Sequence, residues 1–367
     1  MALMKIALLG AGHIGQTIAR QLVATGDYSV TVFDQDPAAL VGLDAAGLVT
    51  RELDTADSAA LLPALRGHDA LVNALPYHLA ARTAAVAGQA GCHYFDLTED
   101  VAATATIRKL AAGARTAFMP QCGLAPGFIG IVAHHLAGQF DTVYDVKMRV
   151  GALPAFPTNA LKYNLTWSVD GLINEYCHPC QAIRDGEMIE VLPLEGLEYF
   201  SLDGTEYEAF NTSGGLGTLC ETWRGRARTL DYKSVRYPGH NALMRFLLEE
   251  LQLRHDQDKL KGILKAAVPA TMQDVVLVFV TVSGVKAGHL VEEVFARKIF
   301  ADRDAAHPLS AIQITTAAGI CAAVDLFRAG RLPRSGFIPQ ETVALPDFLD
   351  NRFGRAYQDL RQVEAIG

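Results

Sequence analysis

Residues 5–15 read KIALLGAGHIG, a short apolar run that leads directly into the glycine pattern GxGxxG. Apolar residues at helical spacing follow the last glycine, and the stretch SVTVFD then predicts a second strand that ends at Asp34. A strand, a glycine turn, a helix and a second strand that ends in an acid together indicate a dinucleotide-binding unit. The opening of the chain therefore predicts a Rossmann-type parallel sheet in an α/β fold.

The three glycines of this turn have different expected tasks. Gly10 permits the tight turn, Gly12 lets the backbone approach a pyrophosphate, and Gly15 lets the helix pack closely on the strand. The pyrophosphate is expected at the helix N-terminus, where free N–H groups and the helix dipole favour an anion. The predicted cofactor-binding residues of the turn are Gly10, Gly12, His13, Ile14 and Gly15.

Asp34 lies nineteen residues after Gly15 and is expected to accept hydrogen bonds from the adenosine ribose hydroxyls. A carboxylate at this position repels a 2′-phosphate. The next residues, Gln35 and Asp36, offer no arginine that would hold one. The sequence therefore predicts NAD rather than NADP as the cofactor.

Short strands and alanine-rich helices continue to alternate along the first third of the chain, which predicts a parallel sheet. The expected strands are GLVTREL (47–53), DALVNAL (69–75), CHYFDL (92–97) and RTAFMP (115–120), and expected helices span 79–90 and 104–113. Ligands bind at the carboxyl ends of such strands. The residues predicted to line the nicotinamide half of the site are Asn73, Ala74, Pro76, Thr98 and Cys122. Alternatively, Asn73 and Thr98 are only turn or helix-cap residues.

The stretch CGLAPG (122–127) is a glycine and proline break and a predicted hinge into a second domain. A helix over Phe128–Ala137 follows, and the middle of the chain is rich in strands at hairpin-like spacing, which predicts an antiparallel or mixed sheet in an α+β domain. A helix is expected over Asn241–Leu253 and a long one over Leu309–Ala329. The predicted division is residues 1–123, 124–308 and 309–367.

Composition excludes several classes of protein. A chain of 367 residues suggests two domains, and a net charge of −8 argues against nucleic-acid binding, which needs a basic face. No apolar run approaches the roughly 18 residues of a membrane span. Six scattered cysteines, with Cys177 and Cys180 as a lone CxxC, fit neither a disulfide framework nor a zinc ribbon. No metal site is expected, and cytoplasmic residence is the default prediction.

The stretch YNLTWSVDGLINEY (163–176) concentrates aromatic and polar side chains in the middle of the chain. Tyr163 and Trp167 are four residues apart and share one face if the stretch is helical. Polar groups here would be costly to bury without partners, which favours a pocket over a purely structural role. The residues predicted to bind substrate are Tyr163, Trp167, Ser168, Asn174, Thr212 and Arg236. Alternatively, the indole belongs to the core and Thr212 to a strand-connecting turn.

The motifs GAGHIG, CGLAPG, YNLTWSVDGLINEY, AFNTSGGLGTL and DYKSVRYPGH resemble the saccharopine dehydrogenase superfamily along essentially the whole chain. The pattern is most similar to lysine 6-dehydrogenases. Relatives that act on saccharopine or carboxynorspermidine tend to have GxDPG where this chain has Gly123 to Gly127 with Ala125, which favours the lysine branch. The resemblance also implies a homodimer and a C-terminal helix that returns to the first domain.

Lysine 6-dehydrogenation, the activity that the resemblance implies, makes three demands. A base must take the proton of the ε-ammonium, and the candidates are Asp96, Glu99 and His240, although Asp96 is also a possible helix cap. A cation must hold the α-carboxylate, for which Arg236 is preferred over Lys233 and Arg224. An apolar or aromatic wall must face the aliphatic stem.

Three alternatives stay open beside NAD-dependent oxidation of lysine. One is a relative that acts on saccharopine or a carboxylated polyamine, with Lys162, Arg184 and Lys233 as extra cations. A second is an aldose-type dehydrogenase, which would need a lysine after the strand that ends at Asp96, where this chain has Leu97. A third is a non-catalytic NAD sensor, because the same fold binds dinucleotides without chemistry.

Overall fold

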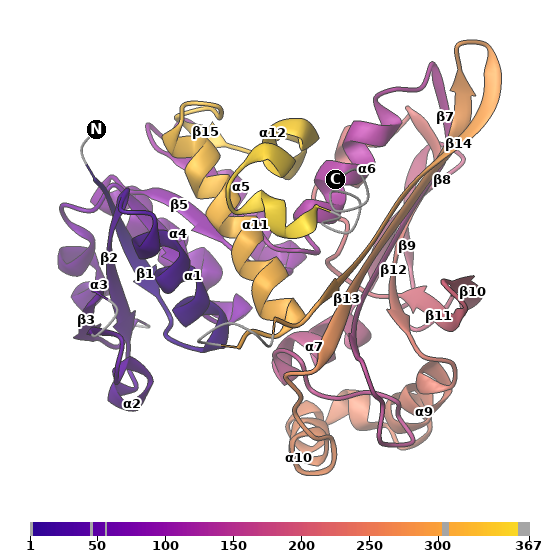
Figure 1. Cartoon of the computed structure of the whole chain (residues 1–367), viewed down its shortest axis with the longest axis horizontal. Helices are drawn as coiled ribbons and strands as arrows, with labels where there is room; N and C mark the ends of the chain where they lie inside the picture. The colour runs from indigo at the N-terminus through magenta and orange to yellow at the C-terminus, as the bar shows by residue number, and fades with distance from the viewer. Residues whose placement is uncertain (1–2, 45–46, 56, 303–307, 359–367) are drawn as a thin grey trace, which may run out of the picture. The chain divides into compact units, whose positions relative to one another are not determined.

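The computed structural model describes residues 3–44, 47–55, 57–302 and 308–358. The end of the predicted C-terminal segment, residues 359–367, lies outside the described residues. The chain divides into two compact units: unit 1 comprises Met1–Phe128 with Thr315–Ala356, and unit 2 comprises Ile129–Ile314 with Tyr357–Gly367. A parallel sheet in unit 1 and a mixed sheet in unit 2 confirm the predicted fold class (Figure 1).

The described part of unit 1 forms a seven-stranded parallel sheet in the order β15-β6-β5-β4-β1-β2-β3. Its strands are β1 (Met4–Leu9), β2 (Tyr28–Asp34), β3 (Val49–Glu52), β4 (Ala70–Asn73), β5 (His93–Asp96), β6 (Ala117–Met119) and β15 (Gly336–Phe337). Strand order reverses beside β1, so the carboxyl end of β1 and the glycine turn lie where ligands bind to such sheets.

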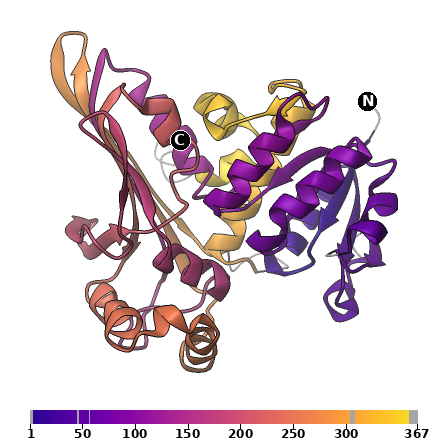
Figure 2. The same cartoon turned by 180° about the vertical axis from the view of Figure 1, so that it is seen from behind.

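Helices cover both faces of this sheet. α1 (His13–Ala24) and α11 (Ala311–Arg328) lie in front of it in Figure 1, and α4 (Ala80–Ala90) and α5 (Val101–Ala111) lie in front in the reverse view of Figure 2. α3 (Ser58–Leu65) packs beside α4 over the core that includes Leu9, Leu71 and Tyr94. The remaining short helices are α2 (Pro37–Leu40), η2 (Tyr77–Leu79), η5 (Gln340–Thr342), α12 (Leu345–Asp350) and η6 (Gly354–Tyr357).

Local sequence explains where these helices begin and end. The Asp57 and Asp100 carboxylates accept backbone N–H groups at the starts of α3 and α5. Gly91 ends α4 in the left-handed region, with φ 74°. Asp100, rather than Asp96, is therefore the helix cap, and the alternative interpretation of Asp96 as a cap was wrong.

The described part of unit 2 forms an eight-stranded mixed sheet. The main path is β10-β11-β12-β7-β13-β14, and β8 pairs with β12 and β9. Its strands are β7 (Thr142–Pro154), β8 (Cys180–Arg184), β9 (Glu187–Val191), β10 (Glu198–Leu202), β11 (Thr205–Asn211), β12 (Ala227–Arg236), β13 (Asp274–Lys286) and β14 (His289–Phe300). Only the β12–β7 pair is parallel among the recorded pairs of this sheet, in keeping with the predicted mixed sheet.

The helices of unit 2 build a second core. α7 (Val169–Cys177) and α10 (Gln257–Ala267) contribute Leu172 and Leu260 to an apolar cluster that also contains Tyr163 and Tyr176. The other helices are α6 (Phe128–Ala137), α8 (Leu219–Trp223), α9 (His240–Arg245), η3 (Phe246–Glu250) and η4 (Leu253–His255). The helix predicted over Asn241–Leu253 is divided, because α9 continues as the π-helical turn η3.

Helix α11 corrects the expectation about apolar runs. It has 18 residues and is apolar enough to cross a membrane by length and composition. However, 78 % of this apolar stretch is buried within the protein, as in the central helix of a folded core.

Candidate functional site

The glycine turn of unit 1 has the geometry of a dinucleotide cradle. A Cβ added to Gly15 would lie 1.9 Å from the carbonyl oxygen of Gly10, so helix and strand pack too closely here for any side chain. A Cβ added to Gly12 would have no neighbour within 4 Å. Gly12 is the N-cap residue of α1 and provides no side-chain cap, and both Gly12 and His13 are exposed. The first N–H groups of α1 are therefore open to an anion.

Asp34 lies at the end of β2 and is bonded to the same turn. Its Oδ2 accepts the backbone N–H of Ala11 at 2.6 Å, and its Oδ1 accepts that of Asp36 at 2.9 Å. The side chain is half-exposed, and each oxygen keeps a lone pair that can accept a further hydrogen bond. The carboxylate is thus fixed beside the glycine turn.

Asp96, a candidate base, lies buried at the end of β5. Its Oδ1 accepts the N–H groups of Thr98 at 3.0 Å and Gln121 at 2.9 Å, and its Oδ2 accepts the Tyr94 hydroxyl at 2.8 Å. Burial raises the pKa of Asp96 to about 6, and these three donors limit the rise. Its exposed fraction is only 1 %. The carboxyl group therefore ties the end of β5 to the loop after β6, a positioning task.

The other predicted residues at these strand ends lie on the same edge of the sheet. Asn73 is buried and donates to the Tyr94 hydroxyl at 3.1 Å, and Thr98 Oγ1 accepts the N–H of Asp100. Cys122 is buried, and burial raises its thiol pKa. Ala74 packs over Gly10, Pro76 precedes η2, and Glu99 is half-buried before α5. Asn73 and Asp96 thus both bond to the Tyr94 hydroxyl, and these bonds stabilise this edge of the sheet. The sequence did not single out Tyr94.

Tyr94 could have been found from one signal. A tyrosine in a buried strand needs a partner for its hydroxyl; Asn73 ends the neighbouring strand β4, and Asp96 ends the strand of Tyr94 itself. Taken together, an open helix N-terminus, a glycine turn without side chains and a fixed acid at the end of β2 fit a dinucleotide bound by unit 1.

Arg236, at the end of β12, is the central residue of a second candidate site, in unit 2. Its exposed fraction is 3 %, yet the ion pairs recorded among the described residues do not include it. Nε donates to the Tyr176 hydroxyl at 2.9 Å and Nη1 to the carbonyl of Val235 at 2.8 Å. No hydrogen bond of Nη2 is recorded within the described chain. Burial of a cation is costly; the charge of the buried Glu175 offsets part of this cost, and the guanidinium keeps capacity for an anionic ligand.

His240 fixes the hydroxyl that Arg236 contacts. Its Nδ1 lies 2.9 Å from the carbonyl of Leu161, so Nδ1 carries the proton and Nε2, 3.1 Å from the Tyr176 oxygen, accepts. Burial, and next the charge of Arg236, lower the pKa of His240 to about 3. Both ring nitrogens have partners and the ring is neutral. This placement argues against the predicted role of His240 as the base and makes it a positioning residue.

Tyr163 and Trp167 lie on the same side of this site, but not as predicted. Residues 163–167 are not helical, because Ser168 is the N-cap of α7 and the helix begins only at Val169. The Tyr163 ring stacks 5.1 Å below the Arg236 guanidinium. Thr166 and Trp167 adjoin the buried Tyr163 hydroxyl, but no hydrogen bond of good geometry forms within the described residues. Hydroxyl and indole donors therefore accompany the guanidinium, as an anion site requires.

The remaining predicted substrate residues have local roles. Ser168 Oγ accepts the N–H of Gly171, and Thr212 bonds to Ser234 at 2.8 Å. The Asn174 side-chain oxygen is buried without a hydrogen-bond partner in the described part of the chain. Glu175, beside it, is buried, and its charge helps to raise the pKa of Arg236 against the effect of burial. Tyr176 was missed as a binding residue, although it ends the same motif.

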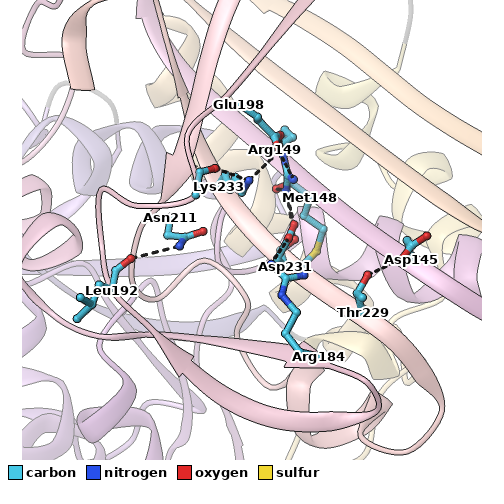
Figure 3. A network of polar contacts seen from close by, with 11 residues as sticks. Asp145, Met148, Arg149, Arg184, Leu192, Glu198, Asn211, Thr229, Asp231 and Lys233 are labelled. Carbon is cyan, nitrogen blue, oxygen red and sulfur yellow. Dashed lines mark hydrogen bonds and ion pairs between the residues drawn. The ribbon is translucent and has the colours of Figure 1, made fainter. Parts of the chain in front are cut away.

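Two of the other cations considered for substrate, Lys233 and Arg184, already bind acids in the polar network of Figure 3. Lys233 and Arg236 are three residues apart on β12, so their side chains point to opposite faces. Lys233 pairs with Glu198 at 2.7 Å, and Arg184 with Asp231 at 3.1 Å. Arg149 joins both acids in the network of Figure 3. The exposed Lys162 donates to a backbone carbonyl, that of Pro238.

Comparison with known proteins assigns both units. The description of the saccharopine dehydrogenase NADP-binding domain matches residues 6–118, and that of the saccharopine dehydrogenase C-terminal domain matches residues 123–354.

Among solved structures, saccharopine dehydrogenase (L-Glu forming) from Saccharomyces cerevisiae has a TM-score of 0.77 at 16 % identity, covering 99 % of this chain and 97 % of that one. A myo-inositol dehydrogenase from Corynebacterium glutamicum has a TM-score of 0.47 at 13 % identity, covering 97 % of each chain. At this identity the yeast enzyme shows a shared fold, and the domain matches show the family. The chain belongs to the saccharopine dehydrogenase family and is an oxidoreductase that uses a nicotinamide dinucleotide.

Proposed function

We propose that this protein is an NAD-dependent dehydrogenase of L-lysine. The ε-carbon loses a hydride to NAD and becomes an imine, which water hydrolyses to the 6-semialdehyde with release of ammonia, and the semialdehyde cyclises to piperideine carboxylate with loss of water. The observation that carries the proposal is Arg236, a buried guanidinium with an open Nη2 and no recorded ion pair among the described residues. Such a group fits the single carboxylate of a small amino acid.

The number of available cations supports lysine over saccharopine. Saccharopine carries additional carboxylates, each of which needs a partner. In unit 2, Arg184 and Lys233 are committed to Asp231 and Glu198 on the face opposite Arg236. Of the three cations considered for a larger substrate, only Lys162 remains. It is exposed and donates to the carbonyl of Pro238.

The protein's own residues bind and orient the reactants. Arg236, steadied by Tyr176 and His240, holds the carboxylate, and Tyr163 and Trp167 provide the wall for the aliphatic stem. In unit 1, the start of α1 and Asp34 hold the dinucleotide, which when bound supplies the acceptor for the hydride of the ε-carbon. Asp96 and His240 are enclosed by internal partners, which weighs against both as the base; Glu99, half-buried before α5, is the third predicted candidate.

Asp34 supports NAD as the preferred cofactor, because its carboxylate stands beside the turn and no arginine follows it. Cytoplasmic residence is part of the proposal, and six free thiols support it.

The test is NADH formation by the purified protein with L-lysine, saccharopine and cadaverine, the diamine without a carboxylate. We expect lysine to be the best substrate, with NAD preferred over NADP. Arg236→Lys should lower kcat/KM for lysine on the order of 100-fold and change that for cadaverine little, since the lost contact is to the carboxylate. Arg184→Lys, on the other face of the sheet, is the matched control.

Other outcomes would redirect the assignment. Turnover of saccharopine without turnover of lysine would move the function to the larger substrates. NAD binding without turnover of any amine would leave only a dinucleotide-binding sensor. Equal losses for lysine and cadaverine in Arg236→Lys would mean that Arg236 has a structural role.

A further inference from the structure

A set of buried oxygen atoms in unit 2 has no hydrogen-bond partner within the described chain. Six buried polar side-chain atoms of the described residues lack a partner, and four of them fall within residues 163–174. These four are the hydroxyls of Tyr163 and Thr166 and the amide oxygens of Asn164 and Asn174. Folded proteins satisfy roughly 90 % or more of their buried polar groups, so this concentration indicates a place where a ligand supplies the partners.

The chemistry of these atoms favours a ligand that donates hydrogen bonds. The two amide oxygens can only accept, and each hydroxyl can accept as well as donate. An ammonium group has three N–H donors and no acceptor, and it therefore fits such a set. The guanidinium of Arg236 has only donors and fits an anion. The two kinds of group together suit a ligand that carries both charges.

Trp167 connects this set to the Arg236 site. The Tyr163 ring lies 5.1 Å from the Arg236 guanidinium, and Trp167 adjoins the Tyr163 hydroxyl. The same indole packs on α7, because a Cβ added to Gly171 would lie 2.3 Å from its Cζ3 atom. The face of α7 that contains Gly171 is therefore the face next to the Arg236 site.

Asn174 and Glu175 lie on this face of α7. They follow Gly171 by three and four residues, a spacing that places all three on one side of a helix. Asn174 is 4 % exposed and Glu175 6 % exposed. An unpartnered amide oxygen and a carboxylate are thus buried one helical turn beyond the residue that the indole covers.

The carboxylate of Glu175 also lies close to the face of β12 that carries Arg236. Tyr232 and Arg236 are four residues apart on β12, so their side chains point to the same face. Burial, and next the charge of Glu175, raise the pKa of Tyr232. Burial lowers the pKa of Arg236, but the neighbouring tyrosines and then Glu175 raise it overall. A negative group and a positive group therefore share one buried site.

The reaction decides which ammonium of lysine fits the acceptors. The ε-amine must lose its proton before the hydride leaves, because an ammonium has no lone pair. A carboxylate and several acceptors favour the charged form of an amine and would oppose that loss. The α-ammonium takes no part in the oxidation, and a single carbon joins it to the carboxylate that Arg236 holds. The acceptors near Arg236 therefore suit the α-ammonium.

We propose that the Glu175 carboxylate and the Asn174 amide oxygen hold the α-ammonium of the substrate, an inference that rests on the proposed function for the carboxylate at Arg236. The site then recognises the complete zwitterionic head group of an α-amino acid. Glu175 and Asn174 are specificity-determining residues, which exclude chains that carry a carboxylate without the α-ammonium.

Two ligands that have no ε-amine test this assignment by binding alone. L-Norleucine has the head group and the chain of lysine, and hexanoate lacks the α-ammonium as well. In calorimetric titration of the full chain with NAD present, L-norleucine should bind on the order of 10- to 100-fold more tightly than hexanoate, the range of a hydrogen bond to a charged group.

Variants of the two residues should remove this preference. Glu175→Gln and, separately, Asn174→Leu, which keeps the size of the side chain, should weaken the binding of L-norleucine and change that of hexanoate little. Glu187→Gln is the matched control, because it makes the same substitution in an exposed ion pair with Arg224. It should leave the preference unchanged.

Two results would overturn the proposal: L-norleucine that binds no better than hexanoate to the natural protein, or variants that weaken both ligands equally, as a structural role would. The first comparison needs no variant, so it decides even if the variants fail to fold. Failure of the proposed function looks different. A protein that does not oxidise lysine but prefers L-norleucine still has the α-ammonium site, whereas lysine oxidation without that preference keeps the function and refutes the site.

Discussion

At the scale of single residues, the site of unit 2 depends on a short chain of hydrogen bonds. The carbonyl of Leu161 fixes the tautomer of His240, His240 accepts the Tyr176 proton, and the Tyr176 oxygen accepts Arg236 Nε. Every donor and acceptor in this chain has one assignment, provided that His240 is neutral. The guanidinium is therefore held in one orientation by its Nε and Nη1 bonds.

The pH dependence of stability tests this arrangement. The pKa of His240 is about 3 in the folded protein and near 6.5 in the unfolded chain. The unfolded chain therefore binds a proton that the folded protein does not, and stability is lost as pH falls from 6.5 towards 3. Urea unfolding of His240→Gln should show a smaller loss between pH 7.5 and pH 5 than the natural protein shows. An unchanged loss would mean that His240 is protonated in the fold.

The contribution of Asp96 to stability changes with pH in the opposite direction to that of His240. Its pKa is about 6 in the folded protein against 3.8 unfolded, so its contribution to stability is complete below 3.8 and is lost as pH rises through 6. Asp96→Asn keeps an oxygen for the N–H groups of Thr98 and Gln121. Between pH 4 and pH 8, the free energy of unfolding of Asp96→Asn should rise relative to that of the natural protein by up to about 3 kcal/mol.

The same variant separates structure from catalysis. If Asp96 only positions the strand ends, kcat of Asp96→Asn should stay within about tenfold of the natural value, because general base catalysis contributes 10²- to 10⁴-fold. A fall of kcat by several orders of magnitude, with NAD binding unchanged, would restore Asp96 as the base.

At the scale of elements, the first strand, turn and helix follow from local sequence alone. β1 and α1 form where the apolar run and the helical spacing predict them, and Asp34 ends β2 as expected. The structure of segment 163–167 could not be predicted in this way. Ser168 caps α7, so Tyr163 and Trp167 lie before the helix. Helix caps are short-range features, but which of several candidates is used depends on packing.

The glycine turn gives a matched pair of variants. Gly15→Ala places a methyl group 1.9 Å from the Gly10 carbonyl oxygen, so it should lower the melting temperature markedly. Gly12→Ala meets no atom within 4 Å and should leave the melting temperature nearly unchanged, yet weaken NAD binding, because the methyl group occupies the space of the pyrophosphate. Calorimetric unfolding and NAD titration measure the two effects. Equal effects of the two variants on stability would contradict this division.

At the scale of the whole molecule, the chain returns from unit 2 to complete unit 1. Residues 315–356 belong to unit 1, and Arg352 joins Asp27 at 2.8 Å and Asp325 at 2.6 Å. The Tyr28 hydroxyl donates to the same Asp325. Residues about 300 positions apart in sequence thus share one polar cluster at the start of β2.

This cluster predicts that the C-terminal segment stabilises unit 1. Arg352→Met should lower the free energy of unfolding on the order of 1 kcal/mol, the range of networked ion pairs near the surface. Arg331→Met removes one exposed pair, with Asp347, and should change it by less than about 0.5 kcal/mol. Chemical denaturation at low and high salt measures both. Equal effects of the two variants would mean that the network adds nothing beyond a single surface pair.

The sequence by itself determined the dinucleotide fold and the strand ends at its edge, because turns, caps and periodicity are encoded within a few residues. Only the tertiary structure decided that Asp96 and His240 are enclosed and that Lys233 lies on the opposite face from Arg236. It also showed that Tyr94 and Tyr176 complete the two sites. Burial and hydrogen-bond partners arise between segments distant in the chain, so no local pattern contains them.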